Sequence, residues 1–179
     1  MNFSTKIINW YNQNYRDLPW RNTTEAYNIW LSEIILQQTR VSQGLPYYNA
    51  FINAFPTVKD LANAEEQQIL KLWQGLGYYS RARNLHFTAK YVMENHNGVF
   101  PNSYEELLKL KGIGTYTAAA IASFSSNEPV AVLDGNVFRV LSRVFNVDYD
   151  ISQNSSKKYF IELATKVLSK SKPDIHNQA

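Results

Sequence analysis

A single glutamate interrupts the apolar segment IWLSEIIL, residues 29–36. In a helix, Glu33 and Gln37 share one face because they are four residues apart. Burial in such surroundings would raise the pKa of the Glu33 carboxyl toward that of a useful general acid. The alternative is a solvated or paired glutamate on a narrow polar stripe, the usual state of isolated charges in apolar helices. Glu33 is therefore a candidate acid, and both environments stay open.

A second carboxylate, Asp134, follows an apolar run and precedes a glycine in PVAVLDGNVFRV, residues 129–140. An aspartate at such a position commonly caps the helix that begins there. Because one carboxylate of this kind has an ordinary structural explanation, Asp134 becomes informative for chemistry only together with Glu33.

A third segment, LKGIGTYTAAAIASF, residues 110–124, places a turn with two glycines before an alanine-rich helix. We expect both Gly112 and Gly114 to permit positive φ and close approach of a ligand, and Thr115 to cap the second helix. The free amides and dipole of that helix would favour an anion, most simply a phosphate of nucleic acid. A plain connector between helices is the competing interpretation.

The elements that must position these residues are helices. The apolar period is helical along nearly the whole chain, and short Pro, Gly, Ser and Asn segments separate the helices. Thr57 with Asp60 and Ser103 with Glu106 have capping-box spacing, with Asp in place of Glu in the first pair. The fold class is therefore all-α, with a candidate boundary at residues 126–135. We expect helices at residues 4–15, 26–36, 42–55, 58–63, 65–76, 80–94, 104–110, 115–123, 136–144 and 155–169.

Composition narrows the functional classes. The chain has 179 residues, a formal charge of +3 and a pI of about 9.0, which are compatible with a polyanionic partner. It has no cysteine, which excludes disulfides, cysteine nucleophiles and cysteine-ligated metal clusters, and its histidines lack the spacing of a metal pair. No apolar run approaches the ~18 residues of a membrane span, so we expect a soluble intracellular protein.

Together these segments resemble the adenine DNA glycosylases of the MutY type, within the superfamily that joins a helix-hairpin-helix to a Gly/Pro-rich segment ending in aspartate (HhH-GPD). The resemblance covers nearly the whole chain. It rests on LPWR at residues 18–21, SEIILQQTRV at 32–41, LWQGLGYYSRARNL at 72–85, LKGIGTYTAAAI at 110–121 and VLDGNVFRVLSR at 132–143.

The resemblance implies a two-lobed helical fold, with DNA and an extruded base in the cleft between the lobes. Residues 23–133 would form a central helical bundle that contains the helix-hairpin-helix at 104–123. The N-terminal helix in residues 1–22 and the C-terminal segment, residues 134–179, would build the second lobe.

The implied function is base excision repair, in which adenine mispaired with 8-oxoguanine or guanine is cut from its sugar. Glu33 matches the acid that protonates the departing base and helps to position water, and Asp134 matches the carboxylate that stabilises or briefly bonds the sugar cation. Tyr116 matches a further catalytic position. The implied substrate contacts are Trp20, Arg21 and Gln178 around adenine, and Leu36, Gln38, Thr39, Leu76 and Tyr78 at positions that wedge the duplex and contact the oxidised guanine. The implied phosphate-binding residues are Gly112, Gly114 and Thr115.

Tyr116 also separates the subfamilies. Bifunctional relatives of the endonuclease III type carry a lysine after the hairpin, whose amine attacks the sugar and leads to strand cleavage. Tyr116 thus favours a monofunctional glycosylase over an endonuclease III-like pyrimidine glycosylase/lyase. A non-catalytic helix-hairpin-helix DNA-binding module also stays open, and such a module would need the glycine turn but neither Glu33 nor Asp134.

Expectations about cofactors and partners follow from the same resemblance. MutY-type enzymes continue into a four-cysteine segment that binds a 4Fe-4S cluster, and then into a domain that recognises oxidised guanine. This sequence contains neither. We therefore expect a truncated chain that binds no metal or cofactor, with the cluster in a full-length member. The expected partner is double-stranded DNA with an adenine mispair, bound by a monomer without membrane association, in the cytoplasm and at the nucleoid in a bacterium.

Overall fold

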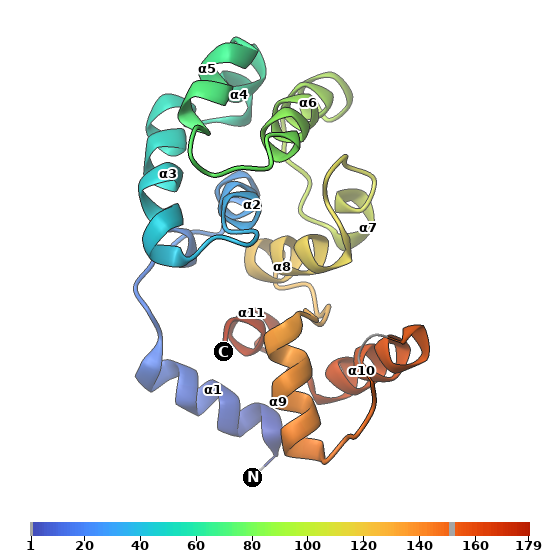
Figure 1. Cartoon of the computed structure of the whole chain (residues 1–179). Coiled ribbons are helices and arrows are strands. Elements are labelled where there is room, and N and C mark those ends of the chain that lie inside the picture. The colour runs from blue at the N-terminus through green and yellow to red at the C-terminus, as the bar shows by residue number, and fades with distance from the viewer. Residues whose placement is uncertain (1, 151–152) are drawn as a thin grey trace.

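A computed structural model of the chain describes residues 2–150 and 153–179. These residues form helices and turns, with no β-strand among them, so the expected all-α fold is confirmed. Figure 1 shows two groups of helices, one above the other. The upper group, here called the bundle, comprises α2 (Ala26–Ile35), α3 (Val41–Ala54), α4 (Val58–Asn63), α5 (Glu66–Leu72), α6 (Ser80–Asn95), α7 (Tyr104–Leu107) and α8 (Thr115–Ser126). The lower group, here called the terminal lobe, comprises α1 (Phe3–Asn14), α9 (Gly135–Phe145), α10 (Asn154–Val167) and α11 (Pro173–Gln178).

The central helix of the bundle is α2, which packs against α3 and α8. All of its residues are buried except Asn28 and Glu33, which are partly buried. Large side chains such as Trp30, Phe51 and Trp73 are fully buried in the same core. Burial of each such side chain stabilises the fold by about 1.5–3 kcal/mol. The surrounding core therefore fixes where the carboxyl of Glu33 lies.

The terminal lobe has a smaller core of its own. α9 packs against α10, and Leu141, Phe160 and Ala164 are buried between them. α11 packs against both α1 and α8, so it joins the terminal lobe to the bundle. α11 is not among the helices expected from the sequence, although Pro173 at its start and Asp174 in its first turn are typical start signals.

Two helices end three or more residues earlier than expected. α5 ends at Leu72 rather than at residue 76, because the chain turns at Gly75, whose φ of +101° is not helical. α7 ends at Leu107 rather than at residue 110, because the following amides of Lys109 and Leu110 bond to carbonyls three residues back, which tightens the last turn.

The two expected capping boxes have different outcomes. The box at Thr57 and Asp60 forms, with both reciprocal hydrogen bonds present. The expected box at Ser103 and Glu106 is wrong. The Ser103 hydroxyl donates to the Glu106 carboxylate at 3.1 Å rather than accepting from the backbone. The amide of Tyr104, which is not one of the two amides of a capping box, donates to Glu128 at 2.8 Å. A distant carboxylate thus satisfies one of the free amides at the start of α7.

The glycine turn between α7 and α8 is only partly as expected. Gly112 has a φ of +80°, in the left-handed region that favours glycine. Gly114 has a φ of −91° and is itself the N-cap of α8, so the expected positive φ at Gly114 and the expected cap at Thr115 are wrong. Thr115 is the first residue of the helix, because the extended backbone of Gly114 already ends the turn.

Along the described chain, none of the helices is long and apolar enough to cross a lipid bilayer.

Candidate active site

A cavity of about 620 Å³ is lined by residues of both the bundle and the terminal lobe. On the bundle side its walls include residues of α2, α3 and α8, and on the terminal side residues of α1, α9, α10 and α11. The short 3-10 helix η1 (Pro19–Arg21), in the segment that joins α1 to α2, completes the wall. The cavity brings together most of the site residues expected from the sequence, namely Glu33, Asp134, Tyr116, Trp20, Arg21, Gln178, Leu36 and Gln38.

Glu33 lies on α2, where that helix meets the cavity. Burial raises the pKa of its carboxyl from an ordinary value of 4.5 to about 7, partly offset by a hydrogen bond with Tyr116. The negative charge of Asp134 raises that pKa further, and the positive charge of Arg21 lowers it. Glu33 therefore exchanges its proton near neutral pH, as a general acid and base must.

Tyr116 lies in the first turn of α8 and lines the same cavity. Burial, together with the charges of Glu33 and Asp134, raises the pKa of its phenol above the ordinary value of 10.0. The hydroxyl consequently keeps its proton at neutral pH and donates a hydrogen bond toward Glu33.

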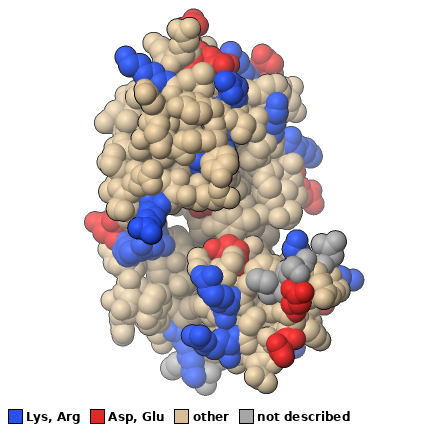
Figure 2. Space-filling view, viewed as in Figure 1, with Lys and Arg blue, Asp and Glu red and all other residues tan. Residues whose placement is uncertain are grey.

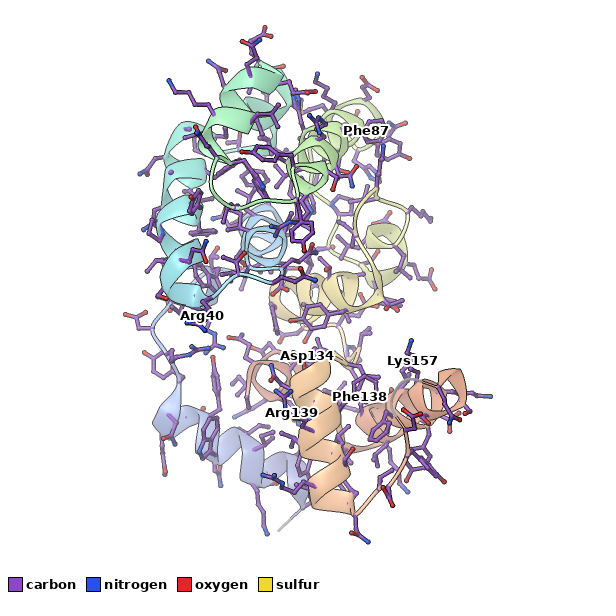
Figure 3. The ribbon with its side chains drawn as sticks, viewed as in Figure 1. Arg40, Phe87, Asp134, Phe138, Arg139 and Lys157 are labelled. Atoms are coloured by element: carbon purple, nitrogen blue, oxygen red, sulfur yellow. The ribbon has the colours of Figure 1, made fainter. Side chains whose placement is uncertain are left out.

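Asp134 is the N-cap of α9, and it also lines the cavity. One carboxylate oxygen accepts hydrogen bonds from the amides of Asn136 at 2.9 Å and Val137 at 2.8 Å, and the other accepts from the Asn136 side chain at 3.0 Å. Figure 3 shows Asp134 at the end of α9 that is nearest the bundle. The same aspartate is thus both a helix cap and a carboxylate held toward Glu33.

The side chains of η1 connect the bundle to α1 and α11. The ring of Trp20 packs edge-on against Tyr48, with ring centroids 5.0 Å apart. The guanidinium of Arg21 lies 5.5 Å from the centre of the Tyr11 ring, and the Tyr11 hydroxyl donates to the side-chain oxygen of Gln178 at 2.8 Å. Arg21 and Gln178 are therefore held in one wall of the cavity through a shared tyrosine.

Asn177 and Asn136 were not identified as candidate site residues from the sequence, yet both line the cavity. The amide nitrogen of Asn177 donates to Ser123 and to the carbonyl of Val130, each at 2.8 Å, and its oxygen accepts from the Val132 amide at 3.3 Å. Asn136 directly follows the Asp134-Gly135 pair, and this position could have identified it as a candidate site residue. Nothing in the sequence around Asn177 indicates partners so far away along the chain.

Several expected contact residues lie outside the cavity. Thr39, Leu76, Tyr78, Gly112, Gly114 and Thr115 are absent from its lining. Gln38 and Tyr78 both have left-handed backbones, with φ of 54° and 46°, and the side chain of Tyr78 is 68% exposed. Thr39, Leu76, Tyr78, Gly112 and Gly114 lie in the segments that follow α2, α5 and α7, and Thr115 is the first residue of α8.

Basic side chains flank the cavity. Figure 2 shows Lys and Arg on both sides of the hollow between the bundle and the terminal lobe, with an acidic side chain between them. Arg40 lies at the start of α3 and Arg139 on α9, and both are exposed. A polyanion that crosses this face would meet positive charge from both groups of helices.

The described residues contain no group of three or more His, Cys, Asp or Glu side chains that could hold a metal ion. Because the sequence has no cysteine, its residues do not fit the 4Fe-4S cluster that the sequence resemblance implies for full-length members.

Comparison with known proteins gives a consistent result. Residues 31–169 match the model of the HhH-GPD superfamily base excision DNA repair proteins. The adenine DNA glycosylase of Buchnera aphidicola subsp. Baizongia pistaciae is 44% identical over 175 residues, which are 97% of this chain and 48% of that protein. The human adenine DNA glycosylase is 40% identical over 99% of this chain and 34% of its own length. The chain thus spans about half or less of these curated relatives.

Solved structures show the same fold. A thermostable thymine-DNA glycosylase has a TM-score of 0.90 at 29% identity, covering 98% of this chain and 81% of that one. A trapped endonuclease III-DNA covalent intermediate has a TM-score of 0.81 at 18% identity, covering 98% of this chain and 79% of that one, and at this identity the likeness concerns the fold alone.

Proposed function

We propose that this chain, which belongs to the HhH-GPD superfamily of base excision DNA repair proteins, hydrolyses the N-glycosidic bond of adenine mispaired with 8-oxoguanine or guanine. The observation that carries the proposal is that Glu33 and Asp134 line one cavity although they are far apart in sequence. The identity of 44% and 40% to proteins named adenine DNA glycosylase supports adenine as the base. A non-catalytic DNA-binding module would have no need of this pair of carboxylates.

In the proposed reaction, adenine leaves the duplex and enters the cavity, because its glycosidic bond is out of reach inside the base stack. Protonated Glu33 donates its proton to a ring nitrogen of the base, and the C–N bond then breaks with both electrons passing to adenine. The sugar is left as an oxocarbenium ion, which the negative charge of Asp134 stabilises. Glu33, now a carboxylate, accepts a proton from the water that attacks the sugar, and this restores the starting state.

The remaining cavity residues would position the base. We propose that Trp20, Arg21 and Gln178 surround adenine, and that Tyr116 orients the carboxyl of Glu33 through its hydrogen bond. Leu36, Gln38, Thr39, Leu76 and Tyr78 are proposed to enter the duplex and contact the base opposite adenine. The exposure of Tyr78 and the left-handed turn at Gln38 support this role, because they place both residues on accessible turns.

The DNA backbone is proposed to meet the glycine turn. A side chain added at Gly114 would have no atom within 4 Å, so the amides at the start of α8 are open to a phosphate. Gly112 allows the turn itself, and Thr115 supplies a hydroxyl at the first helical position. We expect a monomer bound to double-stranded DNA, in the cytoplasm or, in a bacterium, at the nucleoid.

The proposed enzyme is monofunctional, because Tyr116 stands where a lysine would act in the lyase mechanism. A phenol has no amine nitrogen, so Tyr116 cannot form a Schiff base with the sugar. The thymine-DNA glycosylase of similar fold makes thymine the competing base to test.

The test is a single-turnover assay of the purified chain with duplexes that contain A·8-oxoguanine, A·G or T·G pairs. We expect release of adenine from the first two duplexes, and strand breaks only after treatment with alkali. Preferential release of thymine would contradict the assignment of adenine. Tight binding of all three duplexes without base release would instead identify a binding module.

A further inference from the structure

One face of α6 contacts three separate turns of the molecule. Arg81, Asn84 and Thr88 are three and four residues apart along the helix, so they share one face. We call these three residues the α6 stripe. They contact the turn after α2, the turn after α5 and the glycine turn before α8. These turns hold the residues proposed above to meet DNA outside the cavity.

Arg81 joins the first two of these turns. Its Nη1 donates to the carbonyls of Ile34 at 3.0 Å and Gln37 at 2.8 Å, while its Nη2 donates to the carbonyl of Leu76 at 3.2 Å. The guanidinium also lies 5.1 Å from the centre of the Trp73 ring and 5.7 Å from that of Tyr78. One side chain therefore holds the end of α2 and the turn after α5 together.

The chemistry of the guanidinium suits this task. The last carbonyls of a helix have no partner within the helix, and arginine presents five N–H donors in one plane. Lysine has a single ammonium group, which cannot reach carbonyls on opposite sides in the same way. Burial lowers the pKa of Arg81, and the charged form is stabilised because both Nη atoms donate to backbone carbonyls.

The turns that Arg81 joins both contain a left-handed residue, Gln38 with φ 54° and Tyr78 with φ 46°. Residues other than glycine adopt this conformation at a cost, and they keep it only where the surroundings hold them. The carbonyl of Gln37, directly before Gln38, is one of the groups that Arg81 holds.

The other two residues of the stripe act on the glycine turn. The Thr88 hydroxyl, fully buried, donates to the carbonyl of Lys111 at 2.8 Å. A Cβ added at Gly112 would come within 3.1 Å of the Cβ of Asn84. The turn thus rests directly on α6.

We propose that the α6 stripe is a positioning device, which fixes the three turns relative to one another before DNA arrives, and that Arg81 couples the turns of Gln38 and Tyr78. This inference rests on the proposed function, since that function supplies the DNA which the turns would meet. The contacts themselves do not depend on it.

The first test is amide hydrogen exchange in the variant Arg81→Lys. We expect exchange to become about tenfold faster at residues 37–39 and 76–79 together, the effect of about one lost hydrogen bond, with residues 111–115 unchanged. Arg83→Lys is the matched control, because Arg83 lies on the same helix but makes an exposed ion pair with Glu66 at 3.5 Å. Faster exchange in only one of the two turns, or in neither, would overturn the coupling.

The variant Thr88→Val should give the opposite pattern of amide hydrogen exchange. It removes the hydroxyl bond to Lys111 at nearly constant volume, so the glycine turn should exchange faster while the other two turns keep their rates. Unchanged exchange at residues 111–115 would overturn the role of the stripe in the glycine turn.

A measurement on the unaltered protein covers the case in which Arg81→Lys does not fold. The Nε of Arg81 is buried without a hydrogen-bond partner, so its N–H should exchange at least about tenfold more slowly than that of exposed Arg83. Equal rates for the two side chains would show that Arg81 is mobile and does not hold the turns.

The consequence for DNA is tested separately. Arg81→Lys should slow adenine release from a mismatched duplex by about tenfold, while Arg83→Lys leaves it unchanged. Loosened turns with normal adenine release would overturn the positioning role. If the proposed function is wrong, the unaltered protein itself releases no adenine. The hydrogen-exchange measurements would then still show whether Arg81 couples the turns of Gln38 and Tyr78.

Discussion

The carboxyl of Glu33 changes its protonation near neutral pH, which makes it the residue with the clearest pH signature. Because its pKa in the folded state is raised from 4.5 to about 7, the folded state holds its proton more tightly than the unfolded state does. The contribution of Glu33 to stability is therefore most favourable below pH 4.5, and it is lost as the pH rises through about 7.

The variant Glu33→Gln should accordingly be more stable than the unaltered protein at pH 8, by on the order of 1–3 kcal/mol, because an amide carries no charge to bury. Near pH 4.5 the difference should vanish. Urea unfolding of both proteins at the two pH values measures this. A constant difference across the range would mean that Glu33 is solvated in the folded state.

The same substitution should abolish adenine release while duplex binding persists, because glutamine has the volume of glutamate but cannot protonate the base. A loss of about 10²–10⁴ in rate is typical for removal of a general acid. In the unaltered protein the single-turnover rate should fall as the pH rises above about 7, where Glu33 loses its proton. Near-normal release by Glu33→Gln would refute its role as the acid.

Asp134 combines a structural and a proposed chemical role, and substitutions can separate them. Asn and Ser are also good N-caps, so Asp134→Asn and Asp134→Ser should keep most of the stability, whereas Asp134→Ala should lose about 0.5–2 kcal/mol. If the charge stabilises the sugar cation, all three should lose about 10² or more in rate. Thermal unfolding and single-turnover assays measure the two effects. Normal adenine release by the asparagine variant would leave Asp134 as a cap alone.

At the scale of elements, the two glycines of the hairpin should respond differently to alanine. Gly112→Ala should destabilise the fold by about 1–2 kcal/mol, because Gly112 has a φ of +80° and its Cβ would lie 3.1 Å from Asn84. Gly114→Ala should cost less, about 0.5–1 kcal/mol, because its φ is −91° and no atom lies within 4 Å of the new Cβ, although alanine is a poorer N-cap than glycine.

Binding measurements complete this comparison. If a phosphate occupies the space beside Gly114, Gly114→Ala should weaken binding to all duplexes about equally and leave the folded structure unchanged. Titrations with matched and mismatched duplexes of the same length test this. A loss confined to the mismatched duplex would place a base, rather than the backbone, at this turn.

Asn177 ties α11 to the bundle and to the segment that leads to Asp134. Asn177→Ala should cost about 1–3 kcal/mol, because it leaves buried Ser123 without this partner. Adenine release should also fall if the path of residues 130–132 sets the position of Asp134. Asn95→Ala, which removes an exposed bond to Tyr91 within α6, is the control. Equal unfolding free energies for the two variants would contradict the role of Asn177.

At the scale of the whole molecule, the cavity lies where the bundle meets the terminal lobe, so a bound base should hold the two together. A duplex with a non-hydrolysable adenosine analogue opposite 8-oxoguanine, at a hundred times its Kd, should add about 2.7 kcal/mol of stability. For a chain of this size the Tm should rise by about 5–10 °C. An equal rise with a fully paired A·T duplex would show that binding does not involve the cavity.

The sequence by itself determined the helical class, most helix positions and the segments that carry the candidate carboxylates. Apolar spacing and local capping are properties of neighbouring residues, which is why the box at Thr57 formed as expected. The resemblance in these segments likewise predicted the family, and the match over residues 31–169 confirmed it. The roles assigned to single residues stay predictions.

Only the tertiary structure decided which residues share a site and in which environment. The pKa of Glu33 depends on its burial and on Tyr116, Asp134 and Arg21, which come from three other parts of the chain. The helices at 104 and 115 begin as expected, but the expected caps at Ser103 and Thr115 were wrong, because hydroxyl orientation and turn geometry are set in the folded chain. Arg81 and Asn177 could not be found from the sequence, because backbone carbonyls are among their main partners and every residue type carries one. Such contacts leave no pattern of residue types in the sequence, so only the folded structure shows them.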